Sequence, residues 1–482
     1  MNSVLLEPRA RTAAPHPDLH RRLHAILGDE GLVQDAQAQS PYLSDWLGKW
    51  HGRASLVARP ADTAQTAAVM RVCHETHTPV VTQGGNTGMS GGATPDASGA
   101  QVILSTGRMN RIRVVDPLNN TLVVEAGVLL AQVRQAAQDA NRFFPLSLGS
   151  EGSCTIGGNL ATNAGGIAAL RYGNMRELAL GLEVVLPDGR TWNGLRGLRK
   201  DNSGFDLRQI MIGSEGTLGV ITAAVLKLLP RPISTATAWV GADRLGSLVK
   251  LLAALRERCG ERLAAFEMMS EASLSLVLAH VPGTRAPLAG RHGFHALVEL
   301  SDTCASGLDA QLEEVLGDAL QAGLVSGVAL SATHAQTRDF WNLRDGISQA
   351  QVRAGWAIKH DISLPISAVA DFVPRADEAL RRLAPDVRIV NFGHLGDGNL
   401  HYNVLLPPDT PSAARDARLV EFNRVVHDLV DQYEGSISAE HGVGQLRRDE
   451  LRRYKPAVEY ELMMRIKQAL DPNHLMNPGK IF

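Results

Sequence analysis

The sequence has few cysteines and no long hydrophobic run. None of the four cysteines belongs to a CxxC pair, which argues against a disulfide framework and a structural zinc site; they are Cys73, Cys154, Cys259 and Cys304. No apolar stretch approaches the ~20 residues of a membrane-spanning helix. The net charge of −2 gives no basis for wholesale binding to nucleic acid or to an anionic membrane. We therefore expect free thiols, no nucleic-acid partner and no membrane span.

The N-terminus lacks the hydrophobic segment of a secretory signal. Its opening residues, MNSVLLEPRARTAAPHP, contain arginines but no apolar core. A mitochondrial presequence is the alternative, which acidic Glu7 and the early prolines disfavour. We therefore expect a cytoplasmic protein.

The length predicts two or three domains, because 482 residues exceed one ordinary hydrophobic core. Residues 1 to about 50 read as polar and helical, and an α/β pattern follows from Ser55. After 230–232 (Pro-Arg-Pro), long Leu/Ala/Arg helices alternate with strands. This change favours an α+β region with an antiparallel sheet covered by helices.

The hydrophobic pattern and the turn residues predict the individual elements. Predicted strands cover 55–58, 79–82, 102–105, 121–125, 179–186, 219–229 and 294–299. Predicted helices cover 63–76, 244–258, 308–321, 337–350 and 457–470.

Three glycine-rich segments lie in the first half, each beside a β segment. They are QGGNTGMSGG (83–92), GSEGSCTIGGNLATNAGG (149–166) and GSEGTLG (213–219). Glycine lets the backbone approach a phosphate closely and adopt positive φ, so that successive N–H groups can form an anion-binding nest. One such segment alone is more often a flexible loop, but three together indicate a ligand site. Neither the Rossmann GxGxxG pattern nor the P-loop pattern is matched.

These segments resemble the flavin loops of the vanillyl-alcohol-oxidase type flavoproteins. PVVTQGGNTGMSGG, GSCTIGGNLATNAGG and IGSEGTLGVIT look like that family's FAD loops, and NPGK at 477–480 looks like its C-terminal return. Many relatives tether the flavin through a His in the first loop, where this sequence has Asn86, so we expect non-covalent FAD. The resemblance assigns these residues to FAD: Gln83, Gly84, Gly85, Asn86, Thr87, Gly88, Met89, Leu148, Gly149, Ser150, Ser153, Thr155, Ile156, Gly157, Asn159, Ala161, Thr162, Glu215, Gly219, Ile221 and Asn477.

The same resemblance implies the fold class, which is α+β. We expect a two-subdomain, α/β FAD-binding domain at 1–232 and an α+β substrate (cap) domain with an antiparallel sheet at 233–432. A C-terminal segment, 433–482, would pack back on the FAD domain.

Two histidines flank an Asp-Gly pair in GHLGDGNLH. Asp-Gly between two β-like runs is a strong signal for a two-residue type I′ turn. A hairpin centred there places His394 opposite His401 and Phe392 opposite Asn403. Opposed residues share a sheet face with Cβ atoms ~5 Å apart. The two imidazoles could then share one divalent metal, although two surface histidines beside a turn are the alternative.

A later segment, SAEHGVG (438–444), adds Glu440 beside a third histidine, His441. Two His and one Glu leave open coordination positions, which a catalytic metal needs, and the metal would be Zn²⁺ or Mn²⁺. GHLGDGNLH and SAEHGVG resemble the metal and base motifs of the D-2-hydroxyglutarate and D-lactate dehydrogenase branch of the family. This implies that His394, His401 and Glu440 bind the metal. His441 would be the general base, with hydride passing from the substrate carbon to flavin N5.

Two further segments carry cationic side chains. Residues 337–350 read as a helix with Arg344 and Ser348 at i and i+4, hence on one face. The next segment alternates with period two and puts Lys359 on one face with Asp361. A solvated arginine and a lysine that points to water are the alternative interpretations.

WNLRDGIS and KHDISLP resemble the D-2-hydroxyglutarate enzymes more than the D-lactate or glycolate enzymes. An arginine shared by all of them suits the carboxylate common to 2-hydroxy acids, whereas an extra lysine suits a second carboxylate. The family has Thr where this chain has a serine, which keeps the hydroxyl. The resemblance thus assigns five residues to the substrate: Arg344, Ser348, Lys359, Asn403 and His441.

We therefore expect an FAD- and metal-dependent oxidation of D-2-hydroxyglutarate to 2-oxoglutarate, with D-lactate or another D-2-hydroxy acid as the nearby alternative. A metal-dependent hydrolase and a catalytically inactive flavin-binding protein are the alternatives from other classes. The resemblance suggests an electron-transfer flavoprotein or a quinone as electron acceptor. The oligomeric state stays open, and a homodimer is one option.

Overall fold

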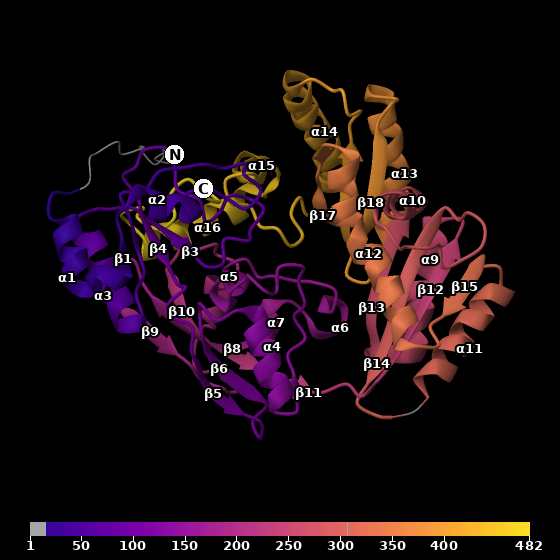
Figure 1. The fold of residues 1–482 in the computed structure, drawn as a ribbon, viewed down its shortest axis with the longest axis horizontal. Helices are drawn as coiled ribbons and strands as arrows, with labels where there is room; N and C mark the ends of the chain where they lie inside the picture. Colours follow the sequence, from indigo (N-terminus) through magenta and orange to yellow (C-terminus); the bar gives the residue numbers. More distant parts are fainter. Residues whose placement is uncertain (1–15, 306) are drawn as a thin grey trace. The chain divides into compact units, whose positions relative to one another are not determined.

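The computed structural model describes residues 16–305 and 307–482, so our interpretation of the first 15 residues lies outside the described part. The chain divides into two compact units (Figure 1). Unit 1 contains the described residues up to Gly165, together with Asn174–Pro230 and Glu440–Phe482. Unit 2 contains Gly166–Gly173 and Arg231–Ala439. The sequence had suggested boundaries at 232 and 432, without the short segment 166–173 in the second part.

Unit 1 begins with a four-stranded sheet in the order β1-β2-β4-β3, in which β4 is parallel to both β2 and β3. Asp62 caps α3 by accepting the Gln65 backbone N–H at 2.8 Å. The predicted elements of this sheet agree with the structure to within one residue at each end. The elements are α1 (Leu19–Gly31), β1 (Leu32–Val33), α2 (Ala36–Gln39), β2 (Leu56–Ala58), α3 (Thr63–Glu75), β3 (Val80–Gln83) and β4 (Val102–Ser105).

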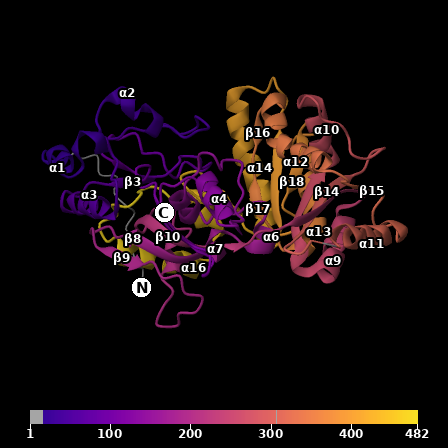
Figure 2. The same cartoon turned by 60° about the horizontal axis from the view of Figure 1, so that its bottom comes forward.

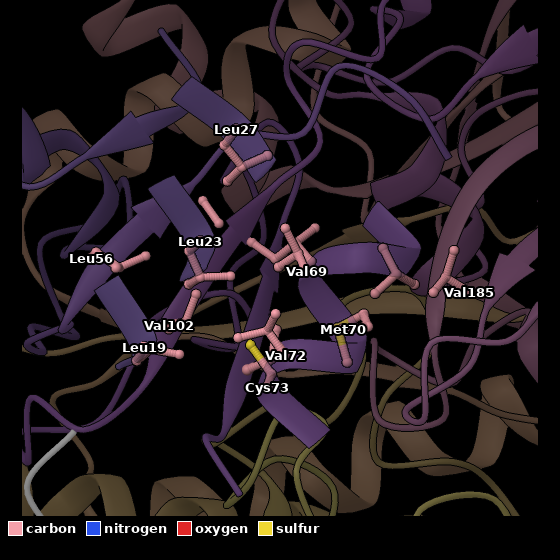
Figure 3. Close-up of a cluster of buried hydrophobic side chains, with 14 of the residues drawn as sticks. Leu19, Leu23, Leu27, Leu56, Val69, Met70, Val72, Cys73, Val102 and Val185 are labelled. Carbon is pink, nitrogen blue, oxygen red and sulfur yellow. The ribbon is translucent and has the colours of Figure 1, made fainter. Parts of the chain in front are cut away.

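The core of this part of unit 1 lies between the two helices and the sheet (Figure 3). Leu19, Leu23 and Leu27 recur every four residues of α1, so they share one face. They meet apolar side chains of α3 and of the sheet, among them Met70. Burying one such side chain contributes about 1.5–3 kcal/mol, so this packing stabilises the sheet whose strand β3 ends at the first glycine-rich segment.

A second sheet of unit 1 has five antiparallel strands in the order β5-β6-β10-β8-β9. Its strands are β5 (Ile112–Asp116), β6 (Thr121–Glu125), β8 (Ala179–Val185), β9 (Thr191–Gly194) and β10 (Val220–Lys227). The remaining elements of unit 1 are α4 (Leu130–Asp139), β7 (Arg142–Phe143), α5 (Ile156–Ala161), α7 (Met175–Leu178), α8 (Arg208–Met211), β11 (Leu229–Pro230), α15 (Arg448–Tyr454) and α16 (Ala457–Leu470).

Unit 2 is built on one antiparallel sheet, as the sequence predicted, in the order β15-β12-β14-β13-β18-β19-β16, with β17 also paired to β19. Its strands are β12 (Ser234–Ala242), β13 (Leu263–Ser270), β14 (Phe294–Asp302), β15 (Gly327–Leu330), β16 (Ala357–Ile358), β17 (Asp361–Ser363), β18 (Arg388–Gly393) and β19 (Asn399–Leu405). The α+β class is therefore confirmed.

Helices cover the sheet of unit 2 (Figure 2). They are α6 (Ala169–Tyr172), α9 (Leu245–Cys259), α10 (Glu271–His280), α11 (Leu308–Gln321), α12 (His334–Ala354), α13 (Ile366–Leu383) and α14 (Ser412–Gln432). Phe340, Leu343 and Ile347 of α12 pack with Trp239 and Leu297 of the sheet. Across the described ranges, no helix combines the length and the apolarity needed to cross a bilayer.

The hairpin of β18 and β19 differs from the predicted one. Five residues connect the two strands instead of two. The predicted pairs His394–His401 and Phe392–Asn403 are wrong, because Phe392 pairs with His401 and Val390 with Asn403. His394 therefore lies in the connecting loop, outside the strand ladder.

Contacts with distant segments explain the longer loop. The Gly396 N–H donates to the Phe266 carbonyl of β13 at 3.2 Å. Arg256 of α9 donates from Nη2 to the Gly396 carbonyl at 2.5 Å. These two tertiary hydrogen bonds hold open a loop that local turn propensity alone would have shortened.

Candidate functional site

A cleft in unit 1 is lined by all three glycine-rich segments. Fourteen residues that the sequence assigned to FAD lie on its wall: Gln83, Gly84, Gly85, Asn86, Thr87, Gly88, Thr155, Gly157, Asn159, Ala161, Thr162, Glu215, Gly219 and Ile221. Six further residues of the wall belong to the same predicted FAD segments: Ser90, Gly92, Cys154, Gly158, Gly216 and Val220. His441 also lines the wall, and sequence reasoning missed Thr82, Ala93 and Thr106.

Seven residues assigned to FAD are not part of this wall: Met89, Leu148, Gly149, Ser150, Ser153, Ile156 and Asn477. Asn477 makes contacts within the protein, and its assignment to FAD stays a prediction. Its Nδ2 donates to the carbonyls of Gly92 and Glu215 at 2.9 and 2.7 Å, and so it ties the first and third loops together.

Glycine is required where the loops interlock. A Cβ on Gly85 would lie 2.0 Å from the carbonyl oxygen of Ser153, and one on Gly84 would lie 2.3 Å from Thr155 Oγ1. Gly216 has a φ of +71°, and a Cβ there would lie 2.0 Å from an atom of β3. The cleft therefore depends on the close approach that only glycine allows.

The cleft contains buried polar side-chain atoms that have no hydrogen-bond partner among the described residues. They are Thr106 Oγ1, Thr155 Oγ1 and Asn159 Nδ2. Buried polar groups are nearly always hydrogen-bonded, so these three atoms indicate a polar ligand. Together with the glycine loops, they fit a dinucleotide such as FAD.

Asn86 occupies the position where a tethering histidine would stand. It has a φ of +52°, a conformation that Asn tolerates better than most residues. Its Nδ2 donates to the Ser44 carbonyl at 2.8 Å. Non-covalent binding of the flavin stays a prediction.

The His441 segment is anchored inside unit 1. Ser90 Oγ donates to the His441 carbonyl at 3.1 Å. The backbone N–H groups of Val443 and Gly444 donate to the Glu215 carboxylate at 2.8 and 2.7 Å. Burial raises the pKa of Glu215, and the two N–H donors offset part of this rise. Glu215 therefore holds the His441 segment at the cleft.

Glu440 and His441 are neighbours in unit 1. Glu440 Oε1 lies 3.8 Å from His441 Nε2, and the two side chains are 21% and 19% exposed. Both groups are therefore accessible to a small ligand.

In unit 2, one buried carboxylate joins two of the predicted site residues. Arg344 Nε donates to Glu267 Oε2 at 2.7 Å, and His394 Nδ1 lies 2.7 Å from Glu267 Oε1. Arg344, His394 and Glu267 are 6%, 7% and 1% exposed, so the solvated-arginine interpretation is wrong. Burial would raise the pKa of Glu267, but the charges and hydrogen bonds of His394 and Arg344 lower it to about 2.

The two histidines of the hairpin lie together despite the changed register. Their ring centroids are 5.6 Å apart. His401 pairs across the sheet with Asp361, and its Nδ1 lies 3.9 Å from Asp361 Oδ1. His394 thus has a carboxylate within hydrogen-bond distance of Nδ1, an arrangement typical of histidines that bind a metal through Nε2, whereas the carboxylate beside His401 lies farther away. This donor set fits a divalent metal.

Lys359 shares a sheet face with His401. β16 and β17 keep one register along β19, which places Lys359 opposite Asn403 and Asp361 opposite His401. No residue of the described chain forms a hydrogen bond or an ion pair with the Lys359 ammonium. Partial desolvation lowers the pKa of this otherwise exposed lysine.

The other two predicted substrate residues of unit 2 differ in environment. Asn403 is buried, and its Nδ2 donates to Gln351 Oε1 of α12 at 2.9 Å. Ser348, on the same helix, is exposed. Gln351 is therefore a further residue of this region that the sequence did not single out.

Sequence reasoning also missed Glu267 and gave Asp361 no role. One signal was available for the first. AAFEMMS contains a single carboxylate in an otherwise apolar strand, and a buried charge needs a partner. The partners themselves, from α12 and the β18–β19 loop, are distant in sequence.

Comparisons with known proteins agree with this architecture. Residues 54–194 match a family model described as FAD binding domain, and residues 231–481 match the model for FAD linked oxidases, C-terminal domain. The chain therefore belongs to the family of FAD-linked oxidases.

Within that family, the similar proteins carry one recurrent name. The chain is 39% identical over 454 residues to the mitochondrial D-2-hydroxyglutarate dehydrogenase of Bos taurus, covering 93% of this chain and 81% of that protein. It is 38% identical over 444 residues to D-2-hydroxyglutarate dehydrogenase of Xanthomonas citri pv. viticola, covering 92% of each. The solved structure of p-cresol methylhydroxylase with substrate bound has the same fold, with a TM-score of 0.75, 17% identity and 96% coverage of both chains. The predicted resemblance to vanillyl-alcohol-oxidase type flavoproteins is confirmed.

Proposed function

We propose that this protein oxidises D-2-hydroxyglutarate to 2-oxoglutarate. The observation that carries the proposal is Lys359, an ammonium that has no partner among the described residues and lies on the sheet face that also bears His401. A substrate with two carboxylates can use both this lysine and Arg344, whereas D-lactate can use only one of them. The names of the relatives point to the same acid.

Each proposed substrate-binding residue would have its own role. Arg344 binds the carboxylate next to the reacting carbon, and Lys359 binds the distal one. Ser348 and Asn403 offer a hydroxyl and an amide for orientation. His441 takes the proton of the substrate hydroxyl, for which an imidazole is suited near neutral pH.

Two bound groups would complete the chemistry. The flavin, held without a covalent bond by the residues of the glycine-rich cleft, supplies the two-electron acceptor. His394, His401 and Glu440 would hold a Zn²⁺ or Mn²⁺ ion, which would lower the pKa of the substrate hydroxyl.

A substrate panel tests the proposal. The holoenzyme is mixed separately with D-2-hydroxyglutarate, L-2-hydroxyglutarate, D-lactate and glycolate. Reduction of the flavin is followed as the loss of its absorbance in the absence of oxygen. Turnover is then measured with an artificial dye as electron acceptor. We expect the highest kcat/KM with D-2-hydroxyglutarate and 2-oxoglutarate as product. An equal or higher kcat/KM with D-lactate would transfer the assignment to that acid, and a colourless, flavin-free protein would favour the hydrolase.

The cellular setting forms part of the same proposal. We propose that electrons leave through an electron-transfer flavoprotein or a quinone and that the protein acts in the cytoplasm, although the bovine relative is named mitochondrial. Cell fractionation would show the location of the protein. Assays without dye, with each acceptor in turn, would show which one reoxidises the flavin. Sedimentation would show whether the protein is a homodimer.

A further inference from the structure

One carboxylate contacts both a residue proposed to bind the substrate and a residue proposed to bind the metal. The two oxygens of Glu267 each lie 2.7 Å from a nitrogen, one of Arg344 and one of His394. The three side chains come from β13, α12 and the β18–β19 loop. On the basis of the proposed function, we infer that Glu267 is a positioning residue that fixes the substrate-binding guanidinium and the metal-binding imidazole relative to each other.

The chemistry of the two neighbours calls for a carboxylate. Arginine can only donate hydrogen bonds, and a histidine that binds a metal through Nε2 must donate from Nδ1. A carboxylate accepts on both oxygens and satisfies both donors at once. No other ordinary side chain of this size presents two acceptors and no donor.

The contacts with Glu267 orient Arg344 and His394 toward their proposed ligands. The guanidinium of Arg344 is held at Nε, and its Cζ lies 5.1 Å from the centre of the Phe392 ring, so the group has little freedom to rotate. Its Nη groups, which form no hydrogen bond with the described part of the chain, can then receive a substrate carboxylate. The ring of His394 is held in the tautomer that directs a lone pair from Nε2.

Glu299 provides a matched control on the neighbouring strand. Its Oε2 accepts from Trp341 Nε1 of α12 at 2.9 Å and from Thr237 Oγ1 at 3.4 Å. It therefore bridges the same sheet and the same helix as Glu267, but it contacts no residue proposed to bind substrate or metal. A Glu→Gln change at this position makes the same chemical substitution and preserves an acceptor oxygen for both partners.

Glu267→Gln separates the two functions of the carboxylate. The amide oxygen must face Arg344, which cannot accept, so the amide NH₂ faces His394 Nδ1. The histidine then has to accept at Nδ1 and carry its proton on Nε2, the atom that would bind the metal. We expect Glu267→Gln to lose metal at about 10–100-fold lower chelator concentration than the wild type, with a smaller change in KM. Flavin content should be unchanged.

A second variant tests the arginine. Glu267→Ala removes both acceptors and should raise KM about tenfold for D-2-hydroxyglutarate and D-lactate alike, since both carry the carboxylate that Arg344 binds. Glu299→Gln should leave metal retention and both KM values unchanged. If Glu267→Ala does not fold, the metal titration of Glu267→Gln still tests whether Glu267 positions His394.

Three results would overturn the inference. The first is a metal titration of Glu267→Gln that equals that of Glu299→Gln, and the second is a folded Glu267→Ala with unchanged KM values. The third is a wild-type enzyme that keeps full activity without metal. This last result removes the metal from the proposed function itself, and it is seen in the wild type before any variant is made.

Discussion

The replacement of Lys359 by methionine tests the substrate assignment most directly. Methionine keeps most of the side-chain length and removes only the charge. A hydrogen bond to a charged group contributes about 1.5–3 kcal/mol when enclosed, which corresponds to about 10- to 150-fold. Because Lys359 is exposed to solvent, screening reduces this value, and a fully hydrated pair would give only about 0–1 kcal/mol. We therefore expect a loss of about tenfold in kcat/KM for D-2-hydroxyglutarate, near the lower limit of the enclosed range.

The same variant should leave D-lactate almost unaffected, because this acid has no distal carboxylate. Arg344→Met should lower kcat/KM for both acids. Lys250→Met is the matched control, since Lys250 is an exposed lysine on α9 of the same unit and should change neither value. The assay is initial-rate dye reduction with each acid, and equal losses on the two acids for Lys359→Met would refute the reasoning.

The pH dependence gives a second measurement on the same residue. Desolvation lowers the pKa of Lys359, so its ammonium loses the proton earlier than an ordinary lysine as the pH rises. The ratio of kcat/KM for D-2-hydroxyglutarate to that for D-lactate should fall as the pH rises through this pKa. In Lys359→Met the ratio should not change with pH, and a ratio that falls equally in the variant would assign the titration to another group.

Further predictions concern the base, the metal, the flavin and the loop that holds the base. His441→Ala should lower kcat by on the order of 10²–10⁴ with a smaller change in substrate binding, as stopped-flow flavin reduction would show; intact turnover would make His441 a bystander. Chelation should abolish turnover while the flavin stays bound, and acid precipitation should release all of the flavin; full activity in a metal-free preparation, or yellow protein in the washed pellet, would contradict these expectations. Glu215→Gln should lower kcat on D-2-hydroxyglutarate and D-lactate by the same factor, because Gln can accept from only one of the two backbone N–H groups that Glu215 binds. Since burial raises the pKa of Glu215, its contribution to stability is present below the ordinary glutamate pKa and is lost as the pH rises through the raised value. The Tm advantage of the wild type over this variant should therefore shrink as the pH rises above the ordinary glutamate range; a constant difference would speak against it.

The glycine-rich cleft was predictable because its signal is local. Each loop contains its own glycines and polar donors within a short window, directly beside a strand. Gly85 illustrates the reason, since its need for space is set by a neighbour in the second loop, Ser153, which carries the same kind of signal. What the local signal did not reveal is that Asn477 also ties two of these loops together.

The hairpin shows where local reasoning fails. Asp-Gly is a strong turn signal, and the chain does turn there, with Gly398 at a φ of +83°. The loop is longer because Phe266 and Arg256, distant in sequence, bind the backbone of Gly396. The prediction that His394 and His401 lie together nevertheless agrees with the structure, since the loop brings His394 back toward β19.

Glu267 illustrates the harder case. Its strand revealed that a partner must exist, but nothing in the sequence around it indicated which residues those partners are. Arg344 lies on a helix 77 positions away, and His394 lies in a loop 127 positions away. Only the packing of α12 on the sheet brings these groups together.

The way unit 1 is completed has a consequence for how the protein is made. Val80 of β3 donates its N–H to the Leu475 carbonyl at 2.8 Å and accepts the Asn477 N–H at 2.7 Å, and Met476 lies in the core. Asn477 also binds the Gly92 carbonyl, 385 positions earlier. At a synthesis rate of about 5–20 residues per second, the ribosome needs roughly 20–80 s to deliver that partner. During this interval all of unit 2 emerges and can fold, while the glycine-rich loops still lack their contacts with the C-terminal segment. The contacts that close the cleft can therefore form only after the C-terminal segment has been synthesised.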